Sequence, residues 1–272
     1  MAINPTITGY DNFFLANEIE DQYNSHLNLM RFVTVDNSLV GRPGMKYMVN
    51  VYKATDGVEK LTKGQGNTKG IGASFTTKEY EILLAQGNVP YYDEDEMTDP
   101  IAVQTAIRHL STDMFNVVNA DIFAEFNKTE QIVTASTPDF GAFVDVAAAF
   151  NVENVENMRI FGFVNPADKA KVRKALKDDL KYVEAYARTG YIGTVAGIDI
   201  YDKADATEGT LVFGTKEAVT VFNKKGVEVE RITRANRSFD DANVRKNAIF
   251  ARKYYVAALT DATKAVKLTL GA

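Results

Sequence analysis

A glycine-rich stretch at residues 63–72, KGQGNTKGIG, places four glycines within ten positions, between two segments with strand character. In MKYMVNVYKA, residues 45–54, apolar and polar side chains alternate, which is the periodicity of a β-strand. Residues 73–85, ASFTTKEYEILLA, are rich in the Thr, Phe, Tyr and Ile that favour strands. The pattern predicts a long β-hairpin, and arms of about ten residues would project it roughly 33 Å.

Such a hairpin needs support from elsewhere, because an isolated two-stranded hairpin is marginally stable in water. We expect the support to come from outside its own subunit, most simply from a neighbouring copy of the chain. The tip residues expected at this inter-subunit contact are Lys60, Lys63, Gly64, Gly66, Lys69 and Gly70.

The same glycines raise the alternative of a phosphate-binding loop in a soluble nucleotide enzyme. Their spacing, at residues 64, 66, 70 and 72, matches neither the GxGxxG fingerprint nor GxxxxGK[ST]. A phosphate loop also uses the N-terminus of a following helix, whereas the segment after these glycines has strand character. The sequence therefore favours a flexible hairpin tip and predicts no cofactor.

The composition also gives little support to catalysis. Of 272 residues, none is cysteine, which excludes disulfides, thiolate zinc sites and a cysteine nucleophile. The only two histidines, His26 and His109, lie far apart, so a histidine metal site or a serine–histidine relay is poorly supplied. We predict no catalytic or metal-binding residues and a protein that is not an enzyme.

Charge and hydropathy indicate where the protein is made and what it touches. The formal net charge is −5, and tight DNA binding relies on Lys and Arg at phosphates, so the chain is a poor candidate for tight DNA binding. The N-terminal residues lack the pattern of a signal peptide. No apolar stretch approaches the roughly 20 residues that span a bilayer. We expect synthesis in the cytoplasm and no membrane contact.

Several charged groups have a functional and a structural interpretation. An acidic run before a predicted helix could bind a cation, although carboxylates are stabilised there by the helix dipole and the ligand spacing of an EF-hand is missing. Two adjacent pairs, Asp178–Asp179 and Asp240–Asp241, have no identifiable catalytic partner. The acidic run consists of Asp93, Glu94, Asp95, Glu96 and Asp99.

The C-terminal third is locally basic and could form a nucleic-acid patch. Its cations are interleaved with acids, however, so we favour contact with acidic residues of a neighbouring subunit. The basic residues are Lys224, Lys225, Arg231, Arg234, Arg237, Arg245, Lys246, Arg252 and Lys253.

The remaining elements follow from periodicity. Residues 10–30 have the spacing of an amphipathic helix, and residues 101–128 predict a second helix roughly 42 Å long. Asn165 and Pro166 mark the start of a third, because Asn caps helices and Pro suits their first turn. The apolar stripe expected along the second helix comprises Val103, Ile107, Leu110, Met114, Phe115, Val117, Val118, Ile122 and Phe126. Strands dominate the C-terminal part, so the fold class predicted is α+β.

The order of elements, with the motifs GFVNPADKAKVRKAL at 162–176 and GIDIYD…GTLVFG…AV at 197–219, resembles the major capsid protein of tailed bacteriophages. These proteins have the Hong Kong 97 type fold. The resemblance implies an N-terminal arm at 1–40, an extended E-loop at 41–92 and a spine-helix region of the peripheral domain at 93–128. It further implies an axial domain at 129–225 and peripheral-domain strands at 226–272.

The resemblance also implies a function. The chain would self-assemble into hexamers and pentamers of an icosahedral phage shell, a virion component that encloses double-stranded DNA. Partners would be copies of itself, a portal and, because the predicted arm begins close to Met1, a separate scaffolding protein. The alternative is the shell of an encapsulin-like bacterial nanocompartment, which resembles the same fold.

Overall fold

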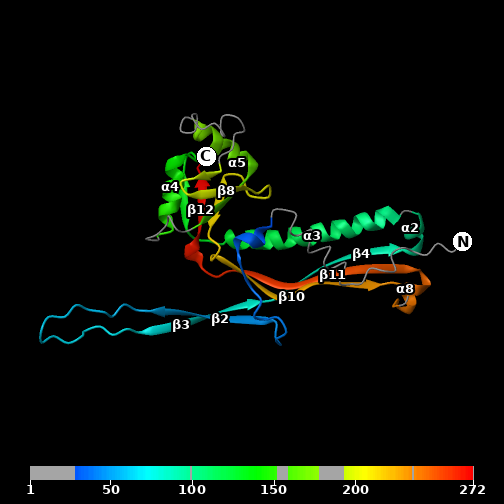
Figure 1. Cartoon of the computed structure of the whole chain (residues 1–272), viewed down its shortest axis with the longest axis horizontal. Helices are drawn as coiled ribbons and strands as arrows, with labels where there is room; N and C mark the ends of the chain where they lie inside the picture. Colours follow the sequence, from blue (N-terminus) through cyan, green and yellow to red (C-terminus); the bar gives the residue numbers. More distant parts are fainter. Residues whose placement is uncertain (1–27, 99, 152–158, 178–192, 235, 272) are drawn as a thin grey trace.

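The computed structural model of the chain describes residues 28–98, 100–151, 159–177, 193–234 and 236–271. Most of the predicted helix at 10–30 and the Asp178–Asp179 pair lie outside these residues. Figure 1 shows a compact lobe, a long helix lying along a sheet, and a ribbon that extends away from both. Short 3-10 helices occupy η1 (Leu29–Phe32) and η3 (Ala262–Lys264).

One sheet has four strands in the order β1-β10-β11-β4. Only the β1–β10 pair is parallel, and the two long central strands are antiparallel neighbours. Burial alternates residue by residue along most of β11, as a half-buried strand requires. The strands are β1 (Thr34–Asp36), β4 (Leu83–Tyr92), β10 (Val219–Ile232) and β11 (Lys246–Leu259).

The long helix α3 (Pro100–Phe126) lies along this sheet (Figure 1). Its 27 residues give a length of roughly 40 Å. Most of the predicted apolar stripe faces the core, and Val118, Ile122 and Phe126 are at most 1% exposed. Val117 was wrongly included in the stripe, because it is 40% exposed. Two short helices lie at the far end of the sheet, α2 (Asp93–Thr98) and α8 (Phe239–Asn243).

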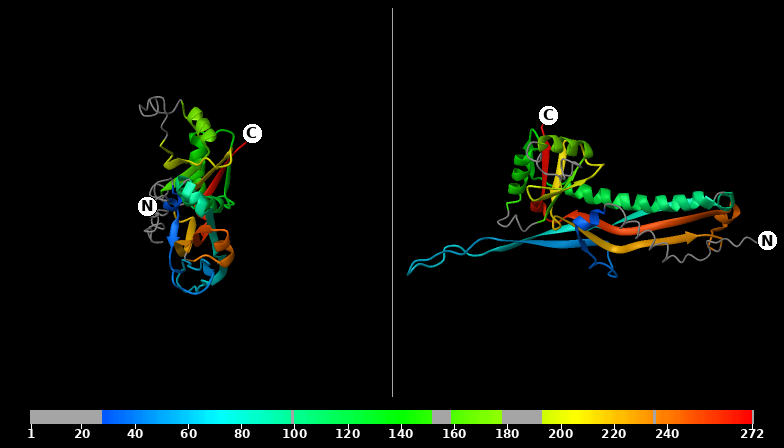
Figure 2. Two further views of the ribbon diagram at one scale, coloured as in Figure 1. Left: turned by 90° about the vertical axis from the view of Figure 1, so that its right-hand side faces the viewer. Right: turned by 45° about the horizontal axis from the view of Figure 1, so that its top comes forward.

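The compact lobe is built on a six-stranded sheet in the order β5-β12-β9-β6-β8-β7 (Figure 2). Its core includes Phe143 from α4 (Phe140–Ala149), Val172 from α5 (Pro166–Ala175) and the sheet residue Phe213. The predicted cap is confirmed, since the Asn165 side chain accepts a hydrogen bond from the Ala167 N–H. The strands are β5 (Ile132–Ala135), β6 (Ile160–Val164), β7 (Thr194–Val195), β8 (Ile198–Asp202), β9 (Thr210–Gly214) and β12 (Ala265–Leu270).

Two of the expected segment boundaries need correction. The last strand, β12, was expected beside the other C-terminal strands, but it pairs with β9 and β5 in the six-stranded sheet. The reason is apolar burial, because Val266 and Leu268 are fully buried in the core of that lobe. The boundary at residues 225/226 also falls inside the continuous strand β10.

The predicted hairpin exists as β2 (Lys46–Ala54) and β3 (Ala73–Glu81), which pair antiparallel along their whole length. The strand predicted at 73–85 is broken at Ile82, and residues 83–92 belong to the four-stranded sheet rather than to the hairpin. Ile82 is only 2% exposed, so its burial fixes the point at which the chain enters the sheet.

Among the described residues, no helix is both long enough and apolar enough to cross a bilayer.

Candidate functional site

The hairpin is attached at its base by a small aromatic cluster. Tyr47 of β2 and Tyr80 of β3 contact the ring of Phe222 on β10, with centroids 4.4 and 5.6 Å away. Leu39 and Ile82 are buried in the same cluster. The Ile82 N–H also donates to the Met45 carbonyl at 2.8 Å. These contacts orient the hairpin, because aromatic pairs add to the stabilisation gained from burial alone.

Polar contacts reinforce the same base. The Tyr47 hydroxyl donates to the Asp36 carboxylate at 3.3 Å, and the Ser38 N–H donates to it at 2.7 Å. The hydrogen bond from the Ser38 backbone is the main reason that the pKa of Asp36 lies below its usual value. The Lys224 ammonium donates to the carbonyls of Arg42 and Leu39, which holds the chain entering the hairpin against β10.

Beyond the base, the hairpin leaves the body of the molecule (Figure 1). Residues Ala73 to Glu79 of β3 are all exposed. Large apolar side chains share this exposure, with Met48 at 63% and Phe75 at 62%. Lys46 and Glu79 form a cross-strand ion pair at 2.5 Å, which is itself on the surface. A protein that places apolar side chains on such a projection presents an interaction surface.

The connection between β2 and β3 has its own internal structure. The Gln65 N–H donates to the Thr62 carbonyl at 3.1 Å, and Gly64 at the third position of this turn has φ +92°. That backbone conformation favours glycine, as in type II turns. The glycine thus serves a turn, and the element that follows is the strand β3, so the helix that a phosphate loop requires is not formed here.

A carboxylate holds the two sides of this connection together. Glu59 accepts hydrogen bonds from the Thr68 N–H at 2.8 Å and the Thr68 hydroxyl at 2.6 Å. The hydroxyl bond is the main cause of the lowered pKa of Glu59. Gly57 lies against the opposite side so closely that a Cβ there would be 2.6 Å from the Ile71 nitrogen. The tip is therefore a narrow ribbon of defined shape.

All the predicted contact residues are exposed in this tip: Lys60, Lys63, Gly64, Gly66, Lys69 and Gly70. The structure brings them together at the end of the hairpin, and their contact with another subunit stays a prediction. In the part of the chain that the structure describes, no ion pair engages the three lysines.

The acidic run and the basic C-terminal third meet within one chain. Asp93 accepts hydrogen bonds from Arg237 and from the Asn247 amide, the latter at 2.9 Å. Hydrogen bonding from Arg237 is the main cause of the lowered pKa of Asp93. Glu94 pairs with Arg245 at 2.6 Å. For Arg237 and Arg245, the expectation of acidic partners on a neighbouring subunit is corrected, because both pair with carboxylates of α2 in their own chain.

The remaining candidates within the described residues form no site. His109 is an exposed residue of α3. Asp241 is engaged at the start of α8, where the Ser238 hydroxyl donates to its carboxylate at 2.7 Å. Within the described ranges, no cluster of three or more His, Cys, Asp or Glu residues is placed to hold a metal ion.

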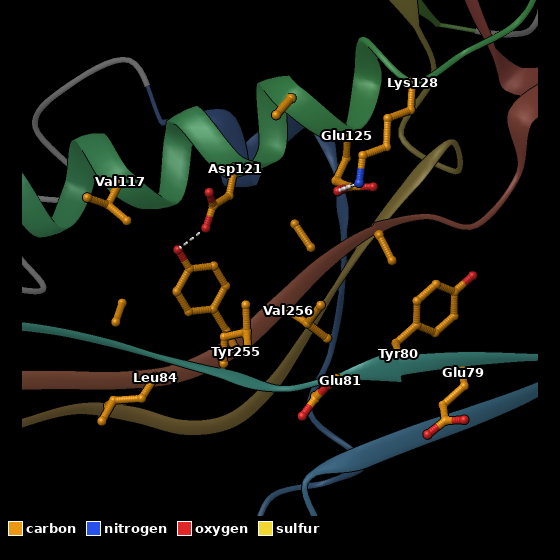
Figure 3. A pocket seen from close by; sticks show the side chains of 15 residues that line it. Glu79, Tyr80, Glu81, Leu84, Val117, Asp121, Glu125, Lys128, Tyr255 and Val256 are labelled. Carbon is orange, nitrogen blue, oxygen red and sulfur yellow. Dashed lines mark hydrogen bonds and ion pairs between the residues drawn. The ribbon is translucent and has the colours of Figure 1, made fainter.

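A groove that sequence reasoning missed lies between the C-terminal half of α3, the base of the hairpin and the edge strand β4 (Figure 3). Its volume is about 540 Å³. Apolar residues on its walls are exposed, with Leu83 at 66%, Leu84 at 45% and Val117 at 40%. The sequence signal was misleading, because these residues satisfy the strand and helix patterns of a core and only the tertiary arrangement leaves them uncovered.

The charged walls of the groove are mainly acidic. They carry Glu79, Glu81, Asp121 and Glu125 against a single cation, Lys128. Asp121 accepts a hydrogen bond from the Tyr255 hydroxyl at 2.6 Å (Figure 3).

Comparison with known proteins gives one curated sequence relative of note. The chain is 25% identical to the major capsid protein of Staphylococcus phage phiMR11, over 94% of this chain and 92% of the relative. No protein-family model matches the sequence.

Solved structures show the same fold over most of the chain. A structure from Mycobacterium phage Che8 matches with a TM-score of 0.66 at 18% identity and covers 86% of this chain and 88% of its own. The capsid of a native GTA particle also gives 0.66, at 16% identity and 90% coverage of each chain. A virus-like particle from Pyrococcus furiosus gives 0.58 at 16% identity, covering 93% of this chain and 97% of its own.

Proposed function

We propose that this chain, which has the Hong Kong 97 type fold of phage capsids, is a major capsid protein that assembles with copies of itself into the shell of a virion. The observation that carries the proposal is the exposed hairpin β2–β3, on a fold that matches capsid structures along most of its length. An extended element with exposed apolar side chains is stable when a neighbouring subunit covers it.

Shell assembly can also stabilise such a hairpin when each of its contacts with neighbouring subunits is modest. A subunit that makes several modest interfaces gains stability when many copies close into one particle, because each further contact becomes effectively intramolecular. Obligate interfaces commonly bury 2,000 Å² or more, which a long ribbon can supply with few residues. The role is structural rather than catalytic.

The parts of the fold take their roles from this assembly. Residues 46–81 act as the E-loop, and α3 with the four-stranded sheet forms the peripheral domain. The lobe with the six-stranded sheet, including β12, is the axial domain that meets its copies around a capsomer centre. Residues 1–40 form the arm, although most of that segment lies outside the described residues.

The finer features of the assembly follow the same proposal. Hexamers and pentamers of the chain form an icosahedral shell around double-stranded DNA, which the inner surface contacts non-specifically. A portal and a separate scaffolding protein are the further partners. Synthesis takes place in the cytoplasm of the bacterial host.

The test is to express the chain and follow its assembly by size-exclusion chromatography and electron microscopy. Closed shells, formed alone or with a scaffolding protein, are the expected result. A stable 30.0 kDa monomer that never assembles under either condition would contradict the proposal.

The second candidate is the shell of a protein-filled nanocompartment. It is favoured by the likeness to a virus-like particle, which extends over nearly the whole of both chains. The contents of purified particles separate the two functions. Large shells with DNA or a portal support the capsid, whereas small uniform shells that enclose an enzyme support the compartment.

A further inference from the structure

The groove beside α3 combines an apolar wall with an excess of negative charge. Leu84 is 45% exposed and Val117 is 40% exposed on that wall. The carboxylates in the groove outnumber the cations, and the lysine that lines it, Lys128, is paired with Glu125. Its volume of about 540 Å³ lies in the range of small-molecule sites, which is roughly 300–1,000 Å³.

Two of the carboxylates have no cation of this chain in an ion pair. Glu79 pairs with Lys46 at 2.5 Å, whereas Glu81 and Asp121 form no ion pair among the described residues. Figure 3 shows Asp121 on α3 and Glu81 on the hairpin side of the groove. The Tyr255 hydroxyl donates to Asp121 at 2.6 Å and so fixes the position of that carboxylate. The groove therefore presents two negative charges on different elements.

Two aromatic rings complete the lining. Tyr80 and Tyr255 both border the groove (Figure 3). Burial, and after it the negative charge of Glu125, raises the pKa of the Tyr80 hydroxyl, so the negative field extends to this ring. The face of an aromatic ring attracts an ammonium group. Rings and carboxylates together are therefore suited to an organic ammonium ion.

The arrangement is less suited to a metal ion. Within the part of the chain that the structure describes, no group of three or more His, Cys, Asp or Glu residues is placed to hold one. A hard divalent cation requires several oxygen ligands around one point, whereas Glu81 and Asp121 come from different elements. A linear molecule with two ammonium groups can reach both carboxylates and lay its methylene chain on the exposed apolar wall, which gains free energy by removing apolar surface from water.

We propose that this groove binds an aliphatic diamine or polyamine, with one ammonium group at Asp121, a second at Glu81 and the methylene chain on Leu84 and Val117. Single exposed ion pairs are weak, so the affinity comes from two charge pairs combined with apolar burial. The bound amine joins α3 to the base of the hairpin and holds the two together. The inference goes beyond the proposed shell function and does not require it.

Isothermal titration calorimetry of the full-length chain tests the ligand class. The probes are spermidine, straight-chain diamines of increasing length, and butylamine, which has a single ammonium group. We expect saturable binding with one preferred diamine length, and butylamine should bind about tenfold more weakly or less, since it forms one charge pair instead of two. Magnesium chloride at the same ionic strength is the control for screening of charges. An equal response to magnesium would overturn the proposal.

Substitutions that remove charge locate the site. Asp121→Asn and Glu81→Gln should each weaken spermidine binding about tenfold, the loss expected for one hydrogen bond to a charged group. Both positions are exposed, so the fold should tolerate the changes. Leu84→Ala should remove the preference for one diamine length, because it shortens the apolar wall.

Matched control substitutions lie at exposed acids away from the groove. Asp145→Asn on α4 and Glu217→Gln between β9 and β10 make the same chemical changes. They should leave the affinity within about twofold of the wild type, as expected for isolated surface charges. If the groove variants and the controls bind spermidine equally well, the proposal is overturned.

Hydrogen exchange tests the joining of α3 to the hairpin base. Saturating spermidine should slow amide exchange in residues 79–85, because the bound amine opposes local opening there. Slowing confined to other segments would contradict the proposal. The groove would instead be a protein-docking surface if spermidine fails to bind while a carbodiimide links Asp121 or Glu81 to a lysine of another chain, and this result would overturn the proposal.

The outcomes distinguish this inference from the proposed function. If the chain forms no shells under any condition but binds spermidine through Asp121 and Glu81, the shell function fails and the groove inference stands. If shells form and spermidine does not bind the chain, the groove inference alone is wrong.

Discussion

At the scale of single residues, the charge cluster around Asp93 is the feature from which we expect a large effect on stability. The Arg237 side chain is 6% exposed and Asn247 is 2% exposed, and both donate hydrogen bonds to the carboxylate in addition to the bonds between them. Removing one member of a buried ion pair leaves the other uncompensated, which is costly. Asp93→Ala should therefore lower the free energy of unfolding by about 3 kcal/mol, measured by denaturant unfolding of unassembled protein.

The neighbouring residue supplies the control for this prediction. Glu94 pairs with Arg245, but both side chains are more than half exposed. Exposed ion pairs contribute little, so Glu94→Ala should cost less than about 1 kcal/mol. Equal effects of the two substitutions would mean that burial around Asp93 does not govern its contribution.

The same carboxylate predicts a pH dependence of stability. Hydrogen bonding from Arg237 holds the pKa of Asp93 below its usual value, so the folded state favours the charged form. A carboxyl group with a lowered pKa stabilises the fold at pH values above its unfolded-state pKa of about 3.9. This contribution to the free energy of unfolding is lost as the pH falls through the folded-state pKa. We expect the melting temperature of Asp93→Ala to fall less than that of the wild type between about pH 5 and pH 3, an interval that brackets the unfolded-state pKa of the carboxyl group. Parallel pH profiles for the two proteins would contradict this assignment.

At the scale of elements, the base of the hairpin decides whether the ribbon is held in position. Tyr80→Ala removes one of the two rings on Phe222 and leaves the sheet beneath intact. Amide exchange in residues 46–54 should accelerate at least tenfold, because the loss of an aromatic contact worth roughly 1.5 kcal/mol raises the open population by that factor. Phe75→Ala, on the exposed part of the same strand, is the control and should leave exchange near the base unchanged.

Elements with a local signal could be predicted from the sequence. Asn165 followed by Pro166 fixes the start of α5, because the cap bond involves only adjacent residues. The two strands and the polar connection of the hairpin follow from alternation and from glycine in the turn.

Elements set by tertiary contacts could not be predicted in this way. The strand-favouring composition of residues 73–85 continues through Ile82, and only the burial of Ile82 against Phe222 shows where the strand is divided. β12 has the same apolar pattern whichever sheet it joins. The groove was invisible for a related reason, since exposure of Val117 depends on what the fold leaves uncovered beside α3.

At the scale of the whole molecule, the connection between β2 and β3 lies at one end of an elongated subunit (Figure 2). The tip makes its defined contacts within itself, through Glu59, Thr68 and the turn at Gly64. Stability of the subunit and competence for assembly should therefore be separable. A change confined to the tip should impair assembly and leave the stability of the subunit unchanged. The following variant is designed to test this.

Replacing residues 56–71 by Asn-Gly would join Thr55 to Gly72 through a two-residue turn. The Thr55 N–H already donates to the Gly72 carbonyl at 2.8 Å, so the two strands are correctly spaced for such a turn. The core clusters contain no residue of the deleted segment, so the melting temperature of the unassembled protein should stay within about 2 °C of the wild type, less than the shift that 1 kcal/mol produces. Shells should fail to form. The variant keeps the rest of the subunit surface but offers no tip to its neighbours, so small amounts of it should stop wild-type assembly. Shells of normal size built from the shortened chain would show that the hairpin tip is dispensable for assembly.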